Sequence, residues 1–214
     1  MAESSITDSL LPSYSHADYA EIVVVRHGKT SWNSEGRVQL AQRLSKEPKI
    51  YAIYSSDLQR AFETAQIIAS KCGGLEVVKD IDLRERHMGN LQGLVYRELT
   101  TTNPIGYEAL VSKNDDQELP GGGESLVQLF ERCKSALLRI GRKHKGERVV
   151  VVTHGASIET LYKWAGTNGR YAGKIDNASI AIFHLYDEDK WTLKIWGDVS
   201  HLNHNEFKGA TSFS

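Results

Sequence analysis

Two histidines, each followed by a glycine, stand at the ends of two runs of β-branched residues. The first run leads into Arg26-His27-Gly28 and the second into Thr153-His154-Gly155. A continuous apolar run is typical of a buried parallel strand, and ligands of open α/β sheets bind beyond the carboxyl ends of such strands. An imidazole can attack phosphorus, and a neighbouring guanidinium offers a planar fork that fits phosphate oxygens. The pattern therefore predicts phosphoryl transfer at the edge of a sheet where both strands end.

Further residues that can bind an anion follow the first histidine. Asn33 can donate a hydrogen bond, and Arg60 lies shortly after Ser56, whose Ser-x-x-Gln pattern is typical of a capping box. A cation in the first turns of a helix is unfavourable by itself and becomes favourable when an anion binds at the helix N-terminus. The alternative is a surface arginine paired with Glu63 or Glu98.

A charged run at residues 82–93 offers a proton donor. Glu85 is one of several acids in this run. A carboxyl group beside a phosphate site can stay protonated and donate its proton to a leaving alkoxide. Because the run holds other acids, the chemistry alone does not select Glu85, and a solvated loop is the alternative interpretation.

Composition limits the class of protein. The chain has 214 residues, of which 40% are hydrophobic and 25% charged, and its formal net charge is −1. This length favours one α/β domain over two, and the composition is ordinary for a globular protein. A net charge near zero gives no general attraction to nucleic acid or to an anionic membrane surface, so we expect neither as a partner.

The cellular compartment and the chain ends are also predicted from composition. Two cysteines, Cys72 and Cys133, cannot build a disulfide framework, and a reduced compartment is the simplest interpretation. The chain has no long apolar run and no secretory signal at its start, so we expect a cytoplasmic protein without a membrane span. We expect a disordered tail at 1–19, a single domain at 20–204 and a mobile tail at 205–214.

Hydrophobic periodicity predicts alternating strands and helices. Short apolar runs predict strands at 22–25, 51–54, 75–78 and 148–152. Helical spacing predicts four helices. Residues 41–47 are the end of the first, the second runs from the cap at 56 to 71, and the others span 125–145 and 156–164. Residues 178–186 and 191–196 predict an antiparallel hairpin. The predicted fold class is α/β, a three-layer α/β/α sandwich around a mostly parallel sheet with an antiparallel edge hairpin.

Five blocks of the chain resemble motifs of the histidine phosphatase superfamily, in its phosphoglycerate-mutase-like branch. The resemblance covers roughly residues 21–203, and its blocks occur in the order that is usual for the family. They are Arg26-His27-Gly28 with Trp32-Asn33; Ser55-Ser56-Asp57-Leu58 with Arg60-Ala61 and Glu63-Thr64-Ala65; Leu83-Arg84-Glu85 with Gly89 and Gln92-Gly93; Gly122-Gly123-Glu124-Ser125; and Thr153-His154-Gly155.

The resemblance implies a role for each matching residue. His27 is the nucleophile that becomes phosphohistidine, and Glu85 protonates the leaving group and then activates water. The phosphoryl group is held by a cationic pocket of Arg26, Asn33, Arg60 and His154, with Gly155 beside it. The implied enzyme is a phosphomonoesterase acting on a small phosphorylated metabolite, without a metal or another cofactor. Such proteins occur as monomers and homodimers, and the sequence does not decide between them.

The chain departs from the family pattern after Gln39. A segment of about 15–20 residues is absent there, which at ~1.5 Å per helical residue removes most of a longer first helix. One flank of the sheet is then expected to be less covered. The alternatives to a phosphatase are a cofactor-dependent phosphoglycerate mutase and a catalytically weak phosphate-binding protein. The short stretch between Gly93 and Pro120 favours an open site and hydrolysis over a mutase.

Other polar residues have less defined roles. His201-x-x-His204 has poor spacing for a metal pair, and we interpret both histidines as structural. Several cationic side chains are candidates to meet a carboxylate or a second phosphate of the substrate: Lys29, Arg37, Arg86, His87 and Arg97.

Overall fold

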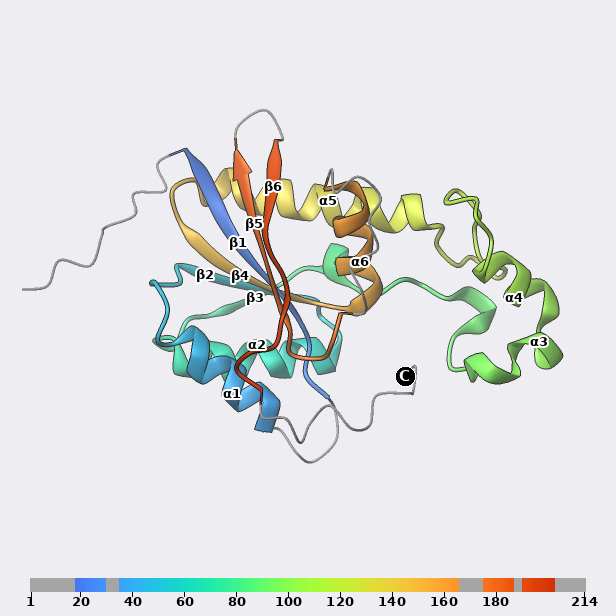
Figure 1. Cartoon of the computed structure of the whole chain (residues 1–214), viewed down its shortest axis with the longest axis horizontal. Coiled ribbons are helices and arrows are strands. Elements are labelled where there is room, and N and C mark those ends of the chain that lie inside the picture. Colours follow the sequence, from blue (N-terminus) through green and yellow to red (C-terminus); the bar gives the residue numbers. More distant parts are fainter. Residues whose placement is uncertain (1–17, 30–34, 166–174, 187–189, 203–214) are drawn as a thin grey trace, which may run out of the picture.

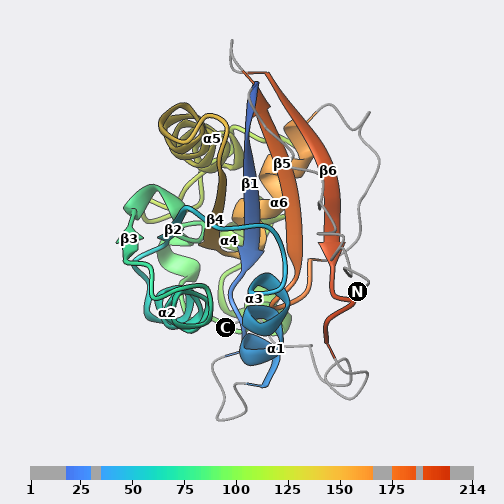
Figure 2. The ribbon, with the colours of Figure 1, turned by 90° about the vertical axis from the view of Figure 1, so that its left-hand side faces the viewer.

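A computed structural model describes residues 18–29, 35–165, 175–186 and 190–202. In this part of the chain a six-stranded sheet has the strand order β3-β2-β4-β1-β5-β6, which Figure 2 shows from edge to edge. The strands are β1 (Tyr19–Arg26), β2 (Ala52–Ser55), β3 (Val77–Lys79), β4 (Arg148–Thr153), β5 (Ile180–Tyr186) and β6 (Trp191–Asp198).

The sheet is parallel through its first four strands and antiparallel at one edge. Strands β3, β2, β4 and β1 pair in parallel. Strand β5 runs antiparallel to β1, and β6 pairs antiparallel to β5. The predicted mostly parallel sheet with an antiparallel edge hairpin is confirmed. The two central parallel strands, β1 and β4, are the β-branched runs of the sequence, as expected for strands that helices cover on both faces.

Helices cover both faces of the sheet (Figure 1). The α-helices are α1 (Glu35–Leu44), α2 (Gln59–Lys71), α3 (Leu99–Thr102), α4 (Pro104–Leu110), α5 (Leu126–Lys143) and α6 (Gly155–Trp164). Three 3₁₀ turns lie at Ile81–Leu83, Gly89–Leu91 and Tyr96–Glu98.

Alternate residues of each central strand face opposite helical layers. In β1, Ile22 and Val24 pack in a core that includes residues of α5 and α6. Val23 and Val25 pack in the second core, with residues of α1 and α2. Because successive side chains of a strand point to opposite faces, one strand serves both cores. The predicted three-layer sandwich is confirmed.

Helix α5 begins where the sequence predicts. The Ser125 side chain accepts a hydrogen bond from Gln128 N at 3.1 Å, and the Gln128 side chain accepts one from Ser125 N at 2.9 Å. This reciprocal pair is a capping box, which satisfies two backbone donors that have no partner inside the helix. The helix then buries Leu129, Cys133 and Leu137 against the sheet.

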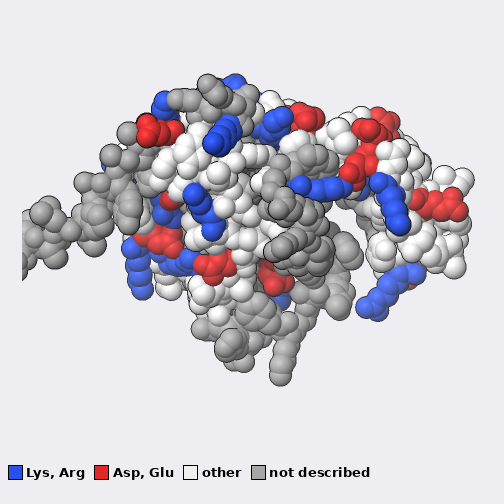
Figure 3. All heavy atoms as spheres, turned by 45° about the horizontal axis from the view of Figure 1, so that its top comes forward, with Lys and Arg blue, Asp and Glu red and all other residues white. Residues whose placement is uncertain are grey.

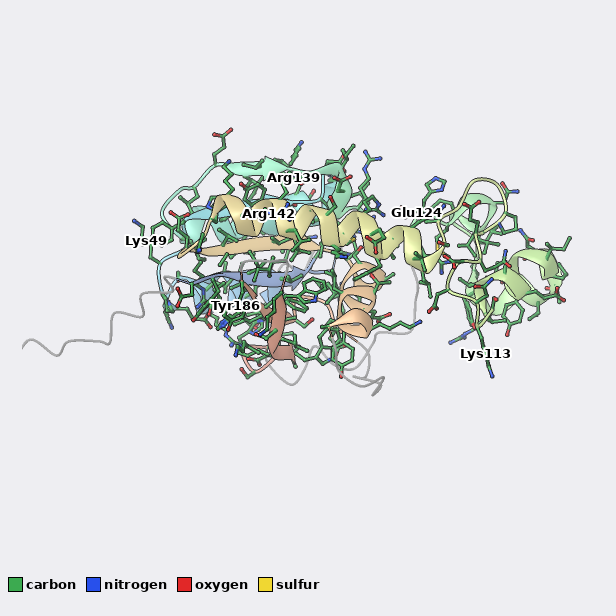
Figure 4. All side chains as sticks on the ribbon, turned by 90° about the horizontal axis from the view of Figure 1, so that it is seen from above. Lys49, Lys113, Glu124, Arg139, Arg142 and Tyr186 are labelled. Carbon is green, nitrogen blue, oxygen red and sulfur yellow. The ribbon has the colours of Figure 1, made fainter. Side chains whose placement is uncertain are left out.

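Helices α3 and α4 form a small lobe beside the sandwich (Figure 1). A separate apolar cluster of Leu91, Leu99 and Leu119 holds the lobe together. Figure 4 labels Lys113 on this lobe and Glu124 at its junction with α5. Both helices of the lobe lie in the short stretch between Gly93 and Pro120.

Three local predictions are corrected by the structure. Helix α2 has Leu58, not Ser56, as its N-cap and no side-chain cap, although the Ser56 hydroxyl accepts a hydrogen bond from Leu58 N at 3.3 Å. Helix α1 starts at Glu35, earlier than expected, and buries Leu40 in the core between the sheet and α2. Tyr19 belongs to β1 instead of the N-terminal tail. Residues 1–17 of that tail and the predicted tail at 205–214 lie outside the described residues.

The surface carries charges of both signs. On the face in Figure 3, Lys and Arg side chains alternate with Asp and Glu side chains, with neither sign dominating the body of the molecule. In the described ranges, no helix is both long and apolar enough to cross a membrane.

Candidate active site

The two strand-end histidines lie side by side because their strands are neighbours in register. Arg26 at the end of β1 pairs with Thr153 at the end of β4. The next residue, His27, donates its backbone N–H to Thr153 O at 2.9 Å. The rings of His27 and His154 therefore meet edge to face, with centroids 5.1 Å apart. Both side chains are buried.

The imidazole of His27 is held by one bond on each ring nitrogen. Its Nδ1 lies 2.8 Å from the carbonyl oxygen of Gly28. Since a carbonyl only accepts, Nδ1 carries the proton and Nε2 keeps its lone pair. Arg60 Nε donates to this Nε2 at 3.2 Å. Burial, followed by the charges of nearby arginines, lowers the pKa of His27 to about 4, so the ring is neutral at neutral pH.

His154 is the N-cap residue of α6, and its ring lies beside that of His27. Its Nε2 lies 2.9 Å from the hydroxyl oxygen of Ser56, which follows β2. Its Nδ1 is buried and has no hydrogen-bond partner among the described residues. Burial first, and then the ring of His27 and the nearby arginines, lower the pKa of His154 to about 2. A neutral ring with a buried, unpaired nitrogen is suited to meeting a ligand atom.

Arg26 lies against the first turn of α6. Its Nη1 donates to the carbonyl oxygen of Ile175, and its Nε is buried without a partner among the described residues. A Cβ atom on Gly155 would lie 3.3 Å from Cζ of Arg26. Glycine at this position therefore lets the guanidinium approach the helix N-terminus closely.

One face of α2 holds the loop that follows β1. Arg60 reaches His27, and Thr64 Oγ1 accepts a hydrogen bond from Gly28 N at 3.1 Å. Between them, Glu63 accepts a hydrogen bond from Arg37 Nη1 at 3.0 Å. The alternative interpretation, a surface arginine paired with Glu63 or Glu98, is not what the structure has: Arg60 contacts His27, and Glu63 accepts hydrogen bonds from Arg37 and Gln59.

The segment with Glu85 crosses the end of β4. Thr153 Oγ1 donates to Leu83 O at 2.7 Å, and Ser157 Oγ donates to Arg84 O at 3.0 Å. These two donors flank His154 in the chain, so they fasten the Glu85 segment beside it. Glu85 itself is half-buried, and its Oε1 accepts a hydrogen bond from Arg86 N at 3.0 Å. Among the described residues its carboxyl group has no hydrogen bond to either histidine.

A third loop supports His27 from the other side of β1. Ala178 N donates to Arg26 O at 3.0 Å, and Asn177 Nδ2 donates to His27 O at 2.9 Å. Ala178 has φ +59°, a left-handed conformation that is uncommon for a residue with a side chain. His201 Nε2 lies 3.0 Å from Ala178 O, and its Nδ1 contacts Arg43, in agreement with the structural role predicted for it.

The structure brings together five of the predicted site residues and places a sixth nearby. His27, His154, Arg26, Arg60 and Gly155 converge, and Glu85 lies in the adjoining segment. Asn33 lies outside the described residues. Sequence reasoning missed Ser56, Thr64 and Asn177. Ser56 directly follows a predicted strand, so the rule that ligands bind beyond strand ends could have found it. Nothing local marks Asn177, because its contact with His27 is made across the fold.

The site is suited to an anion. Helices α2 and α6 both begin just beyond parallel strands, so their partly positive N-termini lie at the same edge of the sheet. Arg26 and Arg60 add full positive charges, while both histidines stay neutral. Within the described ranges, no group of three or more His, Cys, Asp or Glu side chains is arranged to hold a metal ion.

Comparisons with known proteins agree with this geometry. A model described as the histidine phosphatase superfamily (branch 1) matches residues 38–199. Phosphoglycerate mutase-like protein 4 of Arabidopsis thaliana is 56% identical over 207 residues, covering 89% of this chain and 90% of that protein. A metal-independent phosphoserine phosphatase of the same plant is 46% identical over 204 residues, covering 87% of this chain and 85% of that protein.

Solved structures lead to the same family. A mycobacterial glucosyl-3-phosphoglycerate phosphatase in complex with inorganic phosphate superposes with a TM-score of 0.70 at 27% identity, covering 86% of this chain and 99% of that one. The chain belongs to the histidine phosphatase superfamily. The family and the enzyme class predicted from the sequence motifs, a phosphatase, are thereby confirmed.

Proposed function

We propose that this protein hydrolyses a small phosphorylated metabolite through a phosphohistidine intermediate on His27. One observation carries the proposal. The carbonyl oxygen of Gly28 fixes the proton on Nδ1, so Nε2 keeps its lone pair, which accepts a hydrogen bond from Arg60 Nε. A neutral nucleophile next to a fixed cation is the arrangement that phosphoryl transfer requires.

In the first step, Nε2 of His27 attacks phosphorus and the ester P–O bond breaks. The phosphoryl oxygens accept hydrogen bonds from the N–H groups of Arg60, Arg26 and His154. Arg60 gives up its hydrogen bond to Nε2 of His27 in doing so. Glu85, in its protonated form, gives its proton to the leaving oxygen, which departs as an alcohol. Positioning and charge stabilisation supply most of the acceleration in this kind of reaction.

In the second step, water attacks the phosphorus of phosphohistidine and the P–N bond breaks. Glu85, now a carboxylate, accepts the proton of the water. Inorganic phosphate leaves, and His27 returns to the neutral form with its proton on Nδ1. The role of Glu85 is supported by its place in the segment that Thr153 and Ser157 fasten beside His154.

Phosphoserine is the first substrate to test. A relative that is 46% identical over 87% of this chain is named a metal-independent phosphoserine phosphatase. Because phosphoserine carries a carboxylate as well as a phosphate, a cationic site can bind both of its anionic groups. The cytoplasmic location, the single domain at 20–204 and the monomer or homodimer state stay predictions.

The test is phosphate release from phosphoserine, phosphosugars and 3-phosphoglycerate in the presence of a metal chelator. We expect turnover by the wild type, loss of turnover in His27→Ala, and acid-labile phosphate on the wild-type protein after rapid quenching. Arg142→Ala, an exposed change on α5 (Figure 4), is the matched control and is expected to retain activity. Turnover that survives in His27→Ala contradicts the proposal.

The same assay separates the alternative functions. A phosphoglycerate mutase exchanges phosphate between the hydroxyl groups of phosphoglycerate faster than it releases phosphate to water. A phosphate-binding protein without turnover binds phosphate and yields neither product. If a folded wild-type protein gives either result, the corresponding alternative replaces the proposed hydrolase function.

A further inference from the structure

Arg37 is a buried arginine beside the nucleophile to which no role has been assigned. Its side chain is 8% exposed, although arginine is among the residues that are rarely buried. A Cβ atom on Gly28 would overlap Cγ of Arg37 and lie 3.1 Å from its Nε. The stem of Arg37 therefore crosses the residue that directly follows His27, which explains why that residue is a glycine. This arginine is too enclosed to meet a distant part of the substrate, which was one of the sequence-based options.

The guanidinium of Arg37 is only partly satisfied. Its Nη1 donates to Glu63 Oε2 at 3.0 Å, whereas its Nε and Nη2 are buried without a hydrogen-bond partner among the described residues. A buried charged group with unmet donors is unfavourable for folding alone. Its retention beside His27 points to use of the charge by the site.

The partner of Arg37 does not cancel this charge toward the site. Glu63 is 40% exposed, whereas the Arg37 side chain is 8% exposed, although both line one open pocket. Glu63 also accepts a second hydrogen bond, from Gln59 at 2.8 Å. Water screens the carboxylate on its exposed side, but the buried guanidinium is screened much less. The pair therefore presents a net positive potential on its inner side, where His27 lies.

The charged and titratable groups around His27 come from every neighbouring element. Arg26 ends β1, Arg60 lies in the first turn of α2, His154 precedes α6, and Arg37 lies on α1. After burial and the charges of Arg60 and Arg26, the charge of Arg37 also lowers the pKa of His27.

Building on the proposed phosphatase function, we propose that Arg37 is a positioning residue, the third cation of the phosphoryl site. Its charge acts across Gly28 to strengthen binding of the phosphoryl group, without touching the substrate. Glu63 moderates this effect. An ion pair that only joins α1 to α2 has no such influence on the affinity for phosphate, which gives the proposal its test.

The experiment measures inhibition by inorganic phosphate in Arg37→Met and Glu63→Gln. Both variants remove the same ion pair, but they change the charge near His27 in opposite directions. We expect the inhibition constant to rise roughly 10-fold in Arg37→Met and to fall roughly 3-fold in Glu63→Gln, as unit charges in a medium of intermediate dielectric constant require. Arg37→Lys keeps the charge and is expected to restore most of the affinity.

The outcomes are distinct. If both variants weaken phosphate binding equally, or neither changes it, the pair is structural and the inference is wrong. If Arg37→Met does not fold, the direction of the change in Glu63→Gln still decides the question, because only the electrostatic role predicts tighter binding there. If the wild type neither turns over nor binds phosphate, the proposed function itself fails and this inference fails with it.

Discussion

The guanidinium Nε of Arg60 lies 3.2 Å from Nε2 of His27, although 33 positions separate the two residues in the chain. This contact exists because Arg60 lies in the first turn of α2, at the edge of the sheet where β1 ends. In the free protein Arg60 occupies Nε2, the atom that attacks phosphorus in the proposed mechanism. Arg60 is therefore placed to exchange its bond with Nε2 for a bond to a phosphoryl oxygen when substrate binds.

Arg60→Met should reduce kcat/KM about 100-fold or more, because it removes a preorganised donor from the transition state. Arg60→Lys should recover only part of this loss, since a lysine ammonium cannot form the planar two-donor contact. Steady-state kinetics with phosphoserine measure both changes, with Arg142→Met as the surface control. Equal activity of the methionine variant and the wild type would remove Arg60 from the mechanism.

His27 should titrate with a pKa of about 4 in the free protein, well below the ordinary value of 6.5. At neutral pH it should be the tautomer with its proton on Nδ1, held by Gly28 O. Nitrogen-15 imidazole NMR measures both properties, and the resonance is assigned by its loss in His27→Gln. A pKa near 6.5, or a proton on Nε2, would contradict the geometry described here.

Stability should fall as the pH drops below about 6.5. The folded-state pKa values of His27 and His154 are lowered to about 4 and about 2, so the unfolded chain binds more protons than the folded one. The contribution of the neutral rings to the free energy of unfolding is thus fully present above the pKa of the unfolded chain. It is lost as the pH falls toward the pKa values of the folded state. Urea midpoints at about pH 7.5 and about pH 5 test this sign. In His154→Gln the difference between the two midpoints should shrink.

Gly28→Ala should destabilise the protein by about 1–3 kcal/mol, because the new Cβ overlaps the stem of Arg37. The backbone itself permits alanine, since Gly28 is not among the described glycines with positive φ. In an Arg37→Ala background the same change should cost much less. Urea unfolding of the four variants gives this coupling, and an equal cost in both backgrounds would show that the overlap is relieved in another way.

Ser56→Ala should disorient His154 by removing the hydroxyl group 2.9 Å from its Nε2. We expect a fall in kcat/KM of roughly 10-fold and a loss of about 1 kcal/mol in the free energy of unfolding. Ser45→Ala is the matched control, because the Ser45 hydroxyl is exposed and bonds only Gln42 O among the described residues. If the two variants behave alike in kinetics, Ser56 has no influence on the histidine.

The sequence by itself determined which apolar runs form the strands and which two histidines lie at strand ends. A β-branched run such as the one ending at Thr153 favours a buried strand whatever lies around it, so this part of the prediction needed no tertiary information. Likewise, the capping box at Ser125 is a local pattern and was found at the predicted place. By contrast, the capping pattern at Ser56 was misleading: its hydroxyl group contacts Leu58 N and the distant His154, and the helix has Leu58 as its N-cap.

Only the tertiary structure decided which side chains meet. The strand order places β4 between β2 and β1, and this order is not encoded in any local pattern. It sets His154 between Ser56 and His27, residues that are far apart in the chain. The same holds for the burial of Arg37, which depends on how α1 packs against α2. Periodicity reports the environment of one segment, whereas such contacts depend on the free energy of the whole packed arrangement.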